Sequence, residues 1–149
     1  MKSVSYYDVA EDDLLYLEYS IGTIDGAPVF NNFLIQEQQI CEKMLKELVR
    51  RFIFTNNVES ILKSHKLVTL VNAIQSETNW QLNLNDGDLR FLSDFYFDER
   101  YPSIDYLSAT KADALRGYNI VKDVVAATEK MLAEYKQEVK RLHSFDQTK

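Results

Sequence analysis

Apolar residues recur at steps of three and four along most of this chain, which is the spacing of one face of an α-helix. The pattern is strongest between Val29 and Phe54, where we predict a long helix. Its apolar face comprises Phe30, Phe33, Leu34, Cys41, Met44, Leu45, Leu48 and Phe52. Glu42 with Lys46, and Glu47 with Arg51, are spaced as ion pairs four residues apart, and we assign both pairs to the outer surface of this helix.

Four further segments show the same helical periodicity, and each begins near a residue that can cap a helix. After the long helix, Asn56-Asn57 interrupts the pattern, and the stretch Val58 to Lys63 is ambiguous and could form a helical turn. The four predicted helices run from near Ser5 to Gly22, from His65 to about Gln75 after a Ser64 cap, from Asn85 to about Phe97, and from Lys111 to Leu142 after a Thr110–Asp113 capping box.

Glycine and proline are rare, with four and two copies in 149 residues, which favours long helices over a fold with many tight turns. A chain of this length fits one domain, and residues 143–149 are expected to fray. The sequence therefore predicts an all-α, up-and-down bundle of about five helices in a single domain over residues 1–149. We expect its two longest helices, 29–54 and 111–142, to form an antiparallel spine.

The net charge is −6, but the charges are distributed unevenly. Six basic and three acidic side chains lie between Cys41 and Lys66, whereas seven acidic and two basic ones lie between Glu77 and Asp105. A basic segment of this kind can steer an anion to one face of the protein. The alternative is that both segments are solvated helix surface.

The single cysteine, Cys41, excludes an intrachain disulfide and falls on an apolar helix face, where a packing role is expected. The first residues lead into acidic, tyrosine-rich sequence rather than an apolar signal segment. No apolar run approaches the roughly 20 residues that span a bilayer. We expect a cytoplasmic protein with no membrane association.

Metal and cofactor chemistry is not indicated. His65 and His143 are the only histidines, and neither has a Cys, His or carboxylate at a ligand spacing. The four glycines form no phosphate-binding loop. The sequence predicts no metal and no cofactor.

Two segments could carry chemistry. The first is Lys63-Ser64-His65-Lys66, in which an imidazole flanked by lysines at a helix start could bind phosphate or act as a base. The second is Tyr96 to Tyr106, where Arg100 and Tyr101 lie among tyrosines before Pro102 and offer a guanidinium and stacking surfaces. Alternatively, His65 has no role, and Arg100 pairs with a neighbouring carboxylate at the end of the bundle.

At these two segments the sequence resembles the HEPN domains, and the resemblance covers most of the chain. Tyr96-Phe97-Asp98-Glu99-Arg100-Tyr101-Pro102 is its most specific part. The other matching segments are Tyr6 to Ala10 followed by Asp12-Asp13-Leu14 and Leu17-Glu18, Phe33 to Lys46, and Ser64-His65-Lys66-Leu67.

The resemblance implies a prokaryotic α-helical bundle that commonly forms a homodimer. Many members are ribonuclease toxins neutralised by a nucleotidyltransferase partner, and others bind nucleotides. The nuclease members have an arginine followed four to six residues later by a histidine, and this chain departs from that pattern. Its Arg51 lies fourteen residues before His65, and Arg141 lies two before His143. Lys66 also replaces the family's aspartate, so we expect no adjacent carboxylate to orient His65.

Three functions follow from these observations. The first is a non-catalytic HEPN module that binds a nucleotide, another phosphate-bearing ligand or a nucleotidyltransferase-type partner, with a site formed by Lys63, His65, Lys66, Arg100 and Tyr101. The second is a divergent, metal-independent ribonuclease toxin that acts on RNA, with His65 as the base and Arg100 as the phosphate clamp. The third is a protein-interaction subunit that docks through exposed aromatics such as Tyr16, Tyr19 or Trp80. The missing arginine–histidine motif favours the non-enzymatic reading.

Overall fold

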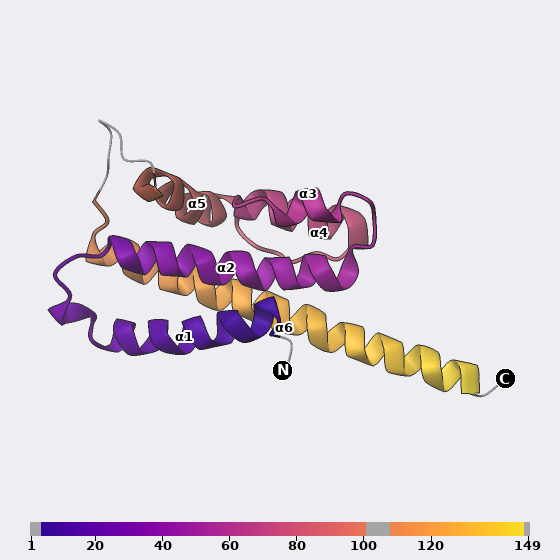
Figure 1. The fold of residues 1–149 in the computed structure, drawn as a ribbon. Helices are drawn as coiled ribbons and strands as arrows, with labels where there is room; N and C mark the ends of the chain where they lie inside the picture. The colour runs from indigo at the N-terminus through magenta and orange to yellow at the C-terminus, as the bar shows by residue number, and fades with distance from the viewer. Residues whose placement is uncertain (1–3, 101–107, 148–149) are drawn as a thin grey trace.

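The computed structural model of this chain describes residues 4–100 and 108–147, and these residues form helices and connecting loops without a strand (Figure 1). The all-α prediction is confirmed. Six α-helices replace the expected five, because the ambiguous stretch after Asn57 forms a short helix of its own. The helices are α1 (Tyr6–Gly22), α2 (Asn31–Phe52), α3 (Val58–Leu62), α4 (Leu67–Thr78), α5 (Asp86–Arg100) and α6 (Lys111–Gln147), with a short 3-10 turn at Ile24–Gly26.

Three of the predicted helix starts are confirmed by their caps. Ser5 and Asp8 form a reciprocal capping box at α1, and Thr110 and Asp113 form another at α6. The Asn85 side chain accepts a hydrogen bond from the backbone N–H of Asp88 at the start of α5. The predicted ends are less accurate, since α5 continues to Arg100 and α6 continues through 143–147, where we expected a frayed tail.

Helix α2 lies at the centre of the bundle and contacts each of the other five helices (Figure 1). Twelve of its 22 residues are buried. The apolar face predicted for this segment supplies much of the core, including Leu34, Cys41 and Leu48. Because other helices cover most of α2, several of its polar residues, among them Glu37, Gln38 and Lys46, are buried as well.

The two longest helices, α2 and α6, run parallel, so the predicted antiparallel spine is wrong (Figure 1). Asn31 at the start of α2 accepts a hydrogen bond from the Ala109 N–H just before α6, and the rings of Phe52 and Tyr135 lie 4.6 Å apart toward the other end. The reason is α3. This short helix adds one reversal of the chain between α2 and α6, so α6 runs in the direction opposite to that expected.

One carboxyl group is enclosed between α2 and α6. Glu37 is fully buried, and neither of its carboxyl oxygens has a hydrogen-bond partner among the residues that the structure describes. Gly117 makes room for it, because a Cβ at position 117 would lie 2.7 Å from the Glu37 Cδ, closer than real Cβ contacts. Burial raises the pKa of Glu37 from 4.5 to about 9, so the group is protonated at neutral pH.

Candidate functional site

The loop between α3 and α4 carries the lysine-flanked histidine, and α2 holds this loop in place. The Gln38 side chain on α2 donates a hydrogen bond to the backbone carbonyl of His65 at 2.9 Å. Within the loop, the Lys66 N–H donates to the Ser64 hydroxyl at 3.1 Å. The predicted Ser64 cap is therefore wrong, because α4 begins at Leu67, and its N-cap, Lys66, provides no side-chain cap.

His65 is paired with a carboxylate, contrary to the sequence expectation. Its Nδ1 lies 2.9 Å from Oε1 of Glu42, which comes from α2 rather than from the residue next to the histidine. The Glu42 side chain is 7% exposed and the His65 side chain 40% exposed. The pair thus fixes a partly accessible imidazole from its buried side, as a carboxylate does in many acid–base sites.

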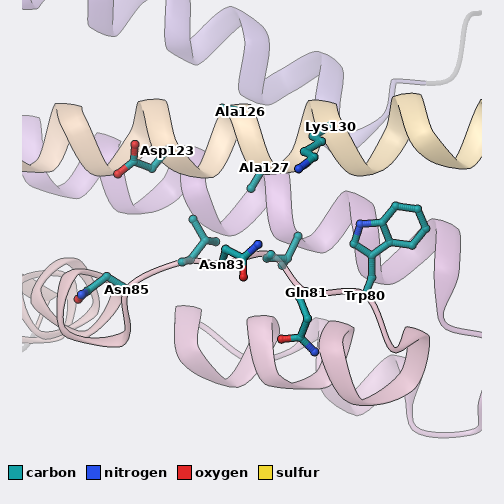
Figure 2. A pocket seen from close by; sticks show the side chains of 10 residues that line it. Trp80, Gln81, Asn83, Asn85, Asp123, Ala126, Ala127 and Lys130 are labelled. Atoms are coloured by element: carbon teal, nitrogen blue, oxygen red, sulfur yellow. The ribbon is translucent and has the colours of Figure 1, made fainter.

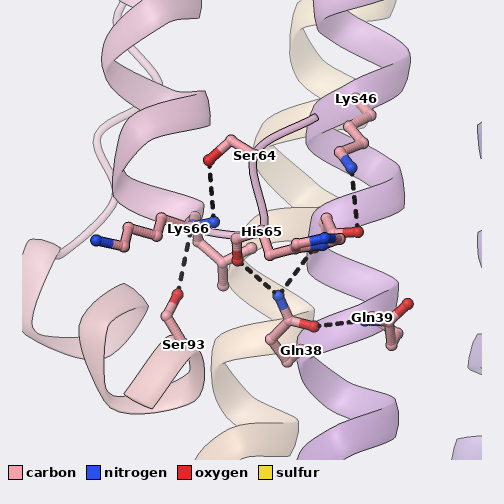
Figure 3. Close-up of polar contacts among 9 residues, drawn as sticks. Gln38, Gln39, Lys46, Ser64, His65, Lys66 and Ser93 are labelled. Atoms are coloured by element: carbon pink, nitrogen blue, oxygen red, sulfur yellow. Dashed lines mark hydrogen bonds and ion pairs between the residues drawn. The ribbon is translucent and has the colours of Figure 1, made fainter. Parts of the chain in front are cut away.

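Glu42 also belongs to a buried polar network, whose members Gln38, Lys46 and His65 are labelled in Figure 3. Its second oxygen, Oε2, lies 3.2 Å from the Nζ of Lys46, and Gln38 donates to Oε1 at 3.2 Å. As whole residues, Glu42 and Lys46 are 5% and 6% exposed. The sequence placed this pair on the outer surface because the spacing of four residues identifies partners but not the side of the helix that other helices cover.

A pocket of about 310 Å³ opens at the N-terminus of α4, lined by Lys66 but not by His65. We name it the α4 pocket, and it is lined by Lys66, Val68, Thr69, Arg90, Ser93 and Asp94. Lys66 and Arg90 are exposed and have no ion-pair partner among the residues that the structure describes. The Ser93 hydroxyl accepts from the Leu67 N–H at 3.2 Å, which joins α5 to the start of α4.

Arg90 is the cation of this pocket that the sequence analysis missed. It lies in the segment that was classified as acidic, 24 positions after Lys66. Within the basic segment, in contrast, several cations are already engaged: Lys43 pairs with Asp13 at 2.7 Å, Lys46 with Glu42, and Arg51 with Glu47 at 3.6 Å. The positive surface that remains is therefore formed by two segments and is smaller than the sequence suggested.

The other predicted site residues are placed as follows. Lys63 is exposed immediately after α3. Arg100 is the last residue of α5, and its side chain lies outside the described part of the structure, as does Tyr101. Along the helix, Arg100 lies seven residues beyond Ser93, or about 10 Å at 1.5 Å per residue. The predicted proximity of His65 and Arg100 thus remains a prediction.

The single cysteine, Cys41, lies in the core of the bundle. Cys41 is fully buried, as expected, and burial raises the pKa of its thiol well above the ordinary value. Among the described residues, no group of three or more His, Cys, Asp or Glu side chains is arranged to hold a metal ion. No helix there is long and apolar enough to cross a membrane.

Comparison with known proteins agrees with the fold. The chain matches the model of the HEPN domain over residues 8–143. No curated protein and no solved structure matches it significantly. Since the match covers most of the sequence, the chain belongs to the HEPN domain family, and the family resemblance is confirmed.

Proposed function

We propose that this protein is a non-catalytic HEPN module that binds a nucleotide or a related phosphate-bearing ligand in the α4 pocket. The observation that carries the proposal is that two cations, Lys66 and Arg90, line one pocket at the N-terminus of α4, where the N-cap residue makes no side-chain hydrogen bond to the helix. Lys63 and His65, from the same loop, extend the site, and Arg100 and Tyr101 remain proposed members of it.

The chemistry of the pocket fits a phosphate group. Backbone N–H groups at the start of a helix, together with the helix dipole, favour an anion. Lys66 and Arg90 would add charge-assisted hydrogen bonds, and the hydroxyl of Thr69 can donate another. Asp94 also lines the pocket and can accept hydrogen bonds from ribose hydroxyls or base amino groups. A nucleotide therefore suits the site better than inorganic phosphate does.

A titration with nucleotides tests this proposal. Lys66→Ala and Arg90→Ala should each weaken binding about 10- to 100-fold, since a hydrogen bond to a charged group contributes about 1.5–3 kcal/mol. Isothermal titration calorimetry with a panel of nucleoside mono-, di- and triphosphates measures the effect. Lys122→Ala is the matched control, because Lys122 is an exposed α6 lysine outside the pocket. If all three variants and the unmodified protein bind nucleotides with equal affinity, the α4 pocket is excluded as the nucleotide-binding site.

Ribonuclease activity is the second candidate, and the Glu42–His65 pair favours it. A carboxylate-held imidazole with 40% exposure could take a proton from an RNA 2′-hydroxyl, and an arginine could stabilise the phosphorane charge. In this case His65→Ala should reduce RNA cleavage about 100-fold or more, and Glu42→Gln should reduce it less. The measurement is cleavage of a labelled RNA by purified protein in excess EDTA. Unmodified protein that leaves the RNA intact would eliminate the nuclease hypothesis.

A protein contact through α1 is compatible with either function. Leu15, Tyr16 and Tyr19 are 66%, 66% and 73% exposed on this helix, which is unusual for large apolar side chains. We infer that this face serves a homodimer or a nucleotidyltransferase-like partner. Trp80, the third predicted aromatic, is half-buried against the core and lies in a different part of the molecule.

A further inference from the structure

Two adjacent residues of α5, Ser93 and Asp94, line the α4 pocket and have hydrogen-bonding capacity that the protein does not use. Ser93 is only 6% exposed. Its hydroxyl oxygen accepts from the Leu67 N–H at 3.2 Å (Figure 3), but no acceptor for its own O–H is found among the residues that the structure describes. A nearly buried hydroxyl with an unused donor favours an acceptor atom on a bound ligand.

The Asp94 carboxylate, in contrast, can only accept hydrogen bonds. Asp94 is exposed, and none of the described lysines or arginines forms an ion pair with it. Arg90 lies four residues earlier on α5, at a spacing where arginine and aspartate can pair, and both residues line the pocket without pairing. They are about 6 Å apart along the helix at 1.5 Å per residue. Arg90 and Asp94 can therefore contact two different parts of one ligand.

Ser93 and Asp94 together offer one donor and two acceptors, which is the complement of one particular base edge. On the Watson–Crick edge of guanine, O6 accepts a hydrogen bond, and the adjacent N1–H and N2 amino groups donate. Adenine and cytosine each have a single amino group beside an acceptor nitrogen, and uracil has one N–H between two carbonyls. None of these three bases can donate from two adjacent groups to one carboxylate.

We propose that the α4 pocket selects guanine nucleotides, with Asp94 accepting from N1–H and the N2 amino group and Ser93 donating to O6. This inference rests on the proposed function, in which the phosphate lies at the N-terminus of α4 beside Lys66 and Arg90. Val68 lines the same pocket and supplies an apolar surface for the base.

Isothermal titration calorimetry of the full chain with four nucleoside diphosphates tests the base selection. Guanosine diphosphate should bind about 10- to 100-fold more tightly than adenosine diphosphate, because adenine cannot donate two hydrogen bonds to the Asp94 carboxylate. Inosine diphosphate, which lacks only the N2 amino group, should have an intermediate affinity. Xanthosine diphosphate should bind more weakly than inosine diphosphate, because a carbonyl oxygen replaces the amino group and faces the carboxylate.

Asp94→Asn should reverse this preference. The asparagine side chain accepts from N1–H and donates to the xanthine carbonyl, so the variant should bind xanthosine diphosphate about tenfold more tightly than guanosine diphosphate. The position is exposed, so the fold is retained. Asp86→Asn is the matched control, because Asp86 is an exposed α5 carboxylate outside the pocket, and this variant should keep the guanine preference.

The single tryptophan of the chain shows whether the nucleotide occupies another cavity. Trp80, Asp123 and Lys130 line a second pocket, of about 430 Å³, between the loop 79–85 and α6 (Figure 2). Trp80 follows the C-terminus of α4, about 16 Å along that helix from its first residue. Guanosine diphosphate in the α4 pocket should leave Trp80 emission unchanged. A saturable change in emission that follows binding would place the nucleotide in the second pocket and overturn the proposal.

The remaining outcomes separate base selection from nucleotide binding. Equal affinity for the guanosine and adenosine diphosphates, with Lys66→Ala weakening both, would support the phosphate site and overturn the guanine assignment. An Asp94→Asn variant that still prefers guanosine diphosphate would also overturn it. If no diphosphate binds at millimolar concentration, both the proposed function and the guanine assignment are wrong.

Discussion

Replacing Glu37 by glutamine should stabilise this protein at pH 8 by several kcal/mol. The carboxyl group is fully buried between α2 and α6 without a hydrogen-bond partner, and its pKa is raised from 4.5 to about 9. Keeping a proton on this group at pH 8 costs free energy, because the unfolded chain would release it. Glutamine has nearly the same shape and has no proton to lose.

The direction in which the free energy of unfolding changes with pH follows from the number of protons that the folded and unfolded states bind. Between pH 4.5 and about 9 the folded protein holds the Glu37 proton and the unfolded chain does not. The contribution of Glu37 to the free energy of unfolding should therefore be most favourable below pH 4.5. It should fall by up to about 1.4 kcal/mol per pH unit across this window and level off above it.

Urea denaturation at pH 5, 6.5 and 8 measures this effect. The gain from Glu37→Gln should be small at pH 5 and grow with pH. Glu59→Gln is the matched control, because it removes one carboxylate from an exposed position on α3 and should show no such trend. A Glu37→Gln variant that is destabilised equally at every pH would mean that the carboxyl group is ionised and paired.

Replacing Glu42 by alanine should destabilise the protein by about 3–5 kcal/mol, because it leaves the buried Lys46 ammonium without its counter-ion. His65 and Gln38 lose the same acceptor. Unfolding in urea gives the free energy, and His65 should lose its fixed position, which the line width and shift of its imidazole protons report by NMR. Replacing both Glu42 and Lys46 by methionine should recover much of the loss, since no buried charge then remains.

The ion pair between Asp13 on α1 and Lys43 on α2 provides the control for this prediction. Asp13 and Lys43 lie 2.7 Å apart, but their side chains are 33% and 26% exposed, and water can replace the lost partner. Asp13→Ala should therefore cost no more than about 1 kcal/mol. Equal losses for Asp13→Ala and Glu42→Ala would show that burial of the Glu42 network contributes nothing.

Much of the fold was predictable because helix periodicity and capping are local properties. The Ser5, Asn85 and Thr110 caps were identified from the sequence, as was the apolar face of α2. The direction of α6 relative to α2 was not, because it depends on whether the five residues Val58–Leu62 form a turn or a helix. Such a short helix owes its existence to packing rather than to its own sequence.

The candidate site was less predictable, because it depends on contacts between residues that lie far apart in the sequence. Lys66 and His65 could be selected as charged residues near a helix start, but Arg90 joins them only because Ser93 anchors α5 to α4. Glu42 was recognised as a partner of Lys46 and not of His65, which lies 23 residues later in the chain. Spacing along one helix cannot indicate which second helix will cover it.

The central position of α2 also limits how this sequence can change. Most substitutions on α2 meet a neighbouring helix, so they require matching changes in several elements at once. The outer helices, in contrast, also have exposed faces, and these can diverge more freely. Homologues of this chain can thus differ widely in their outer helices, and acquire different ligands or partners there, while sharing the same inner helix.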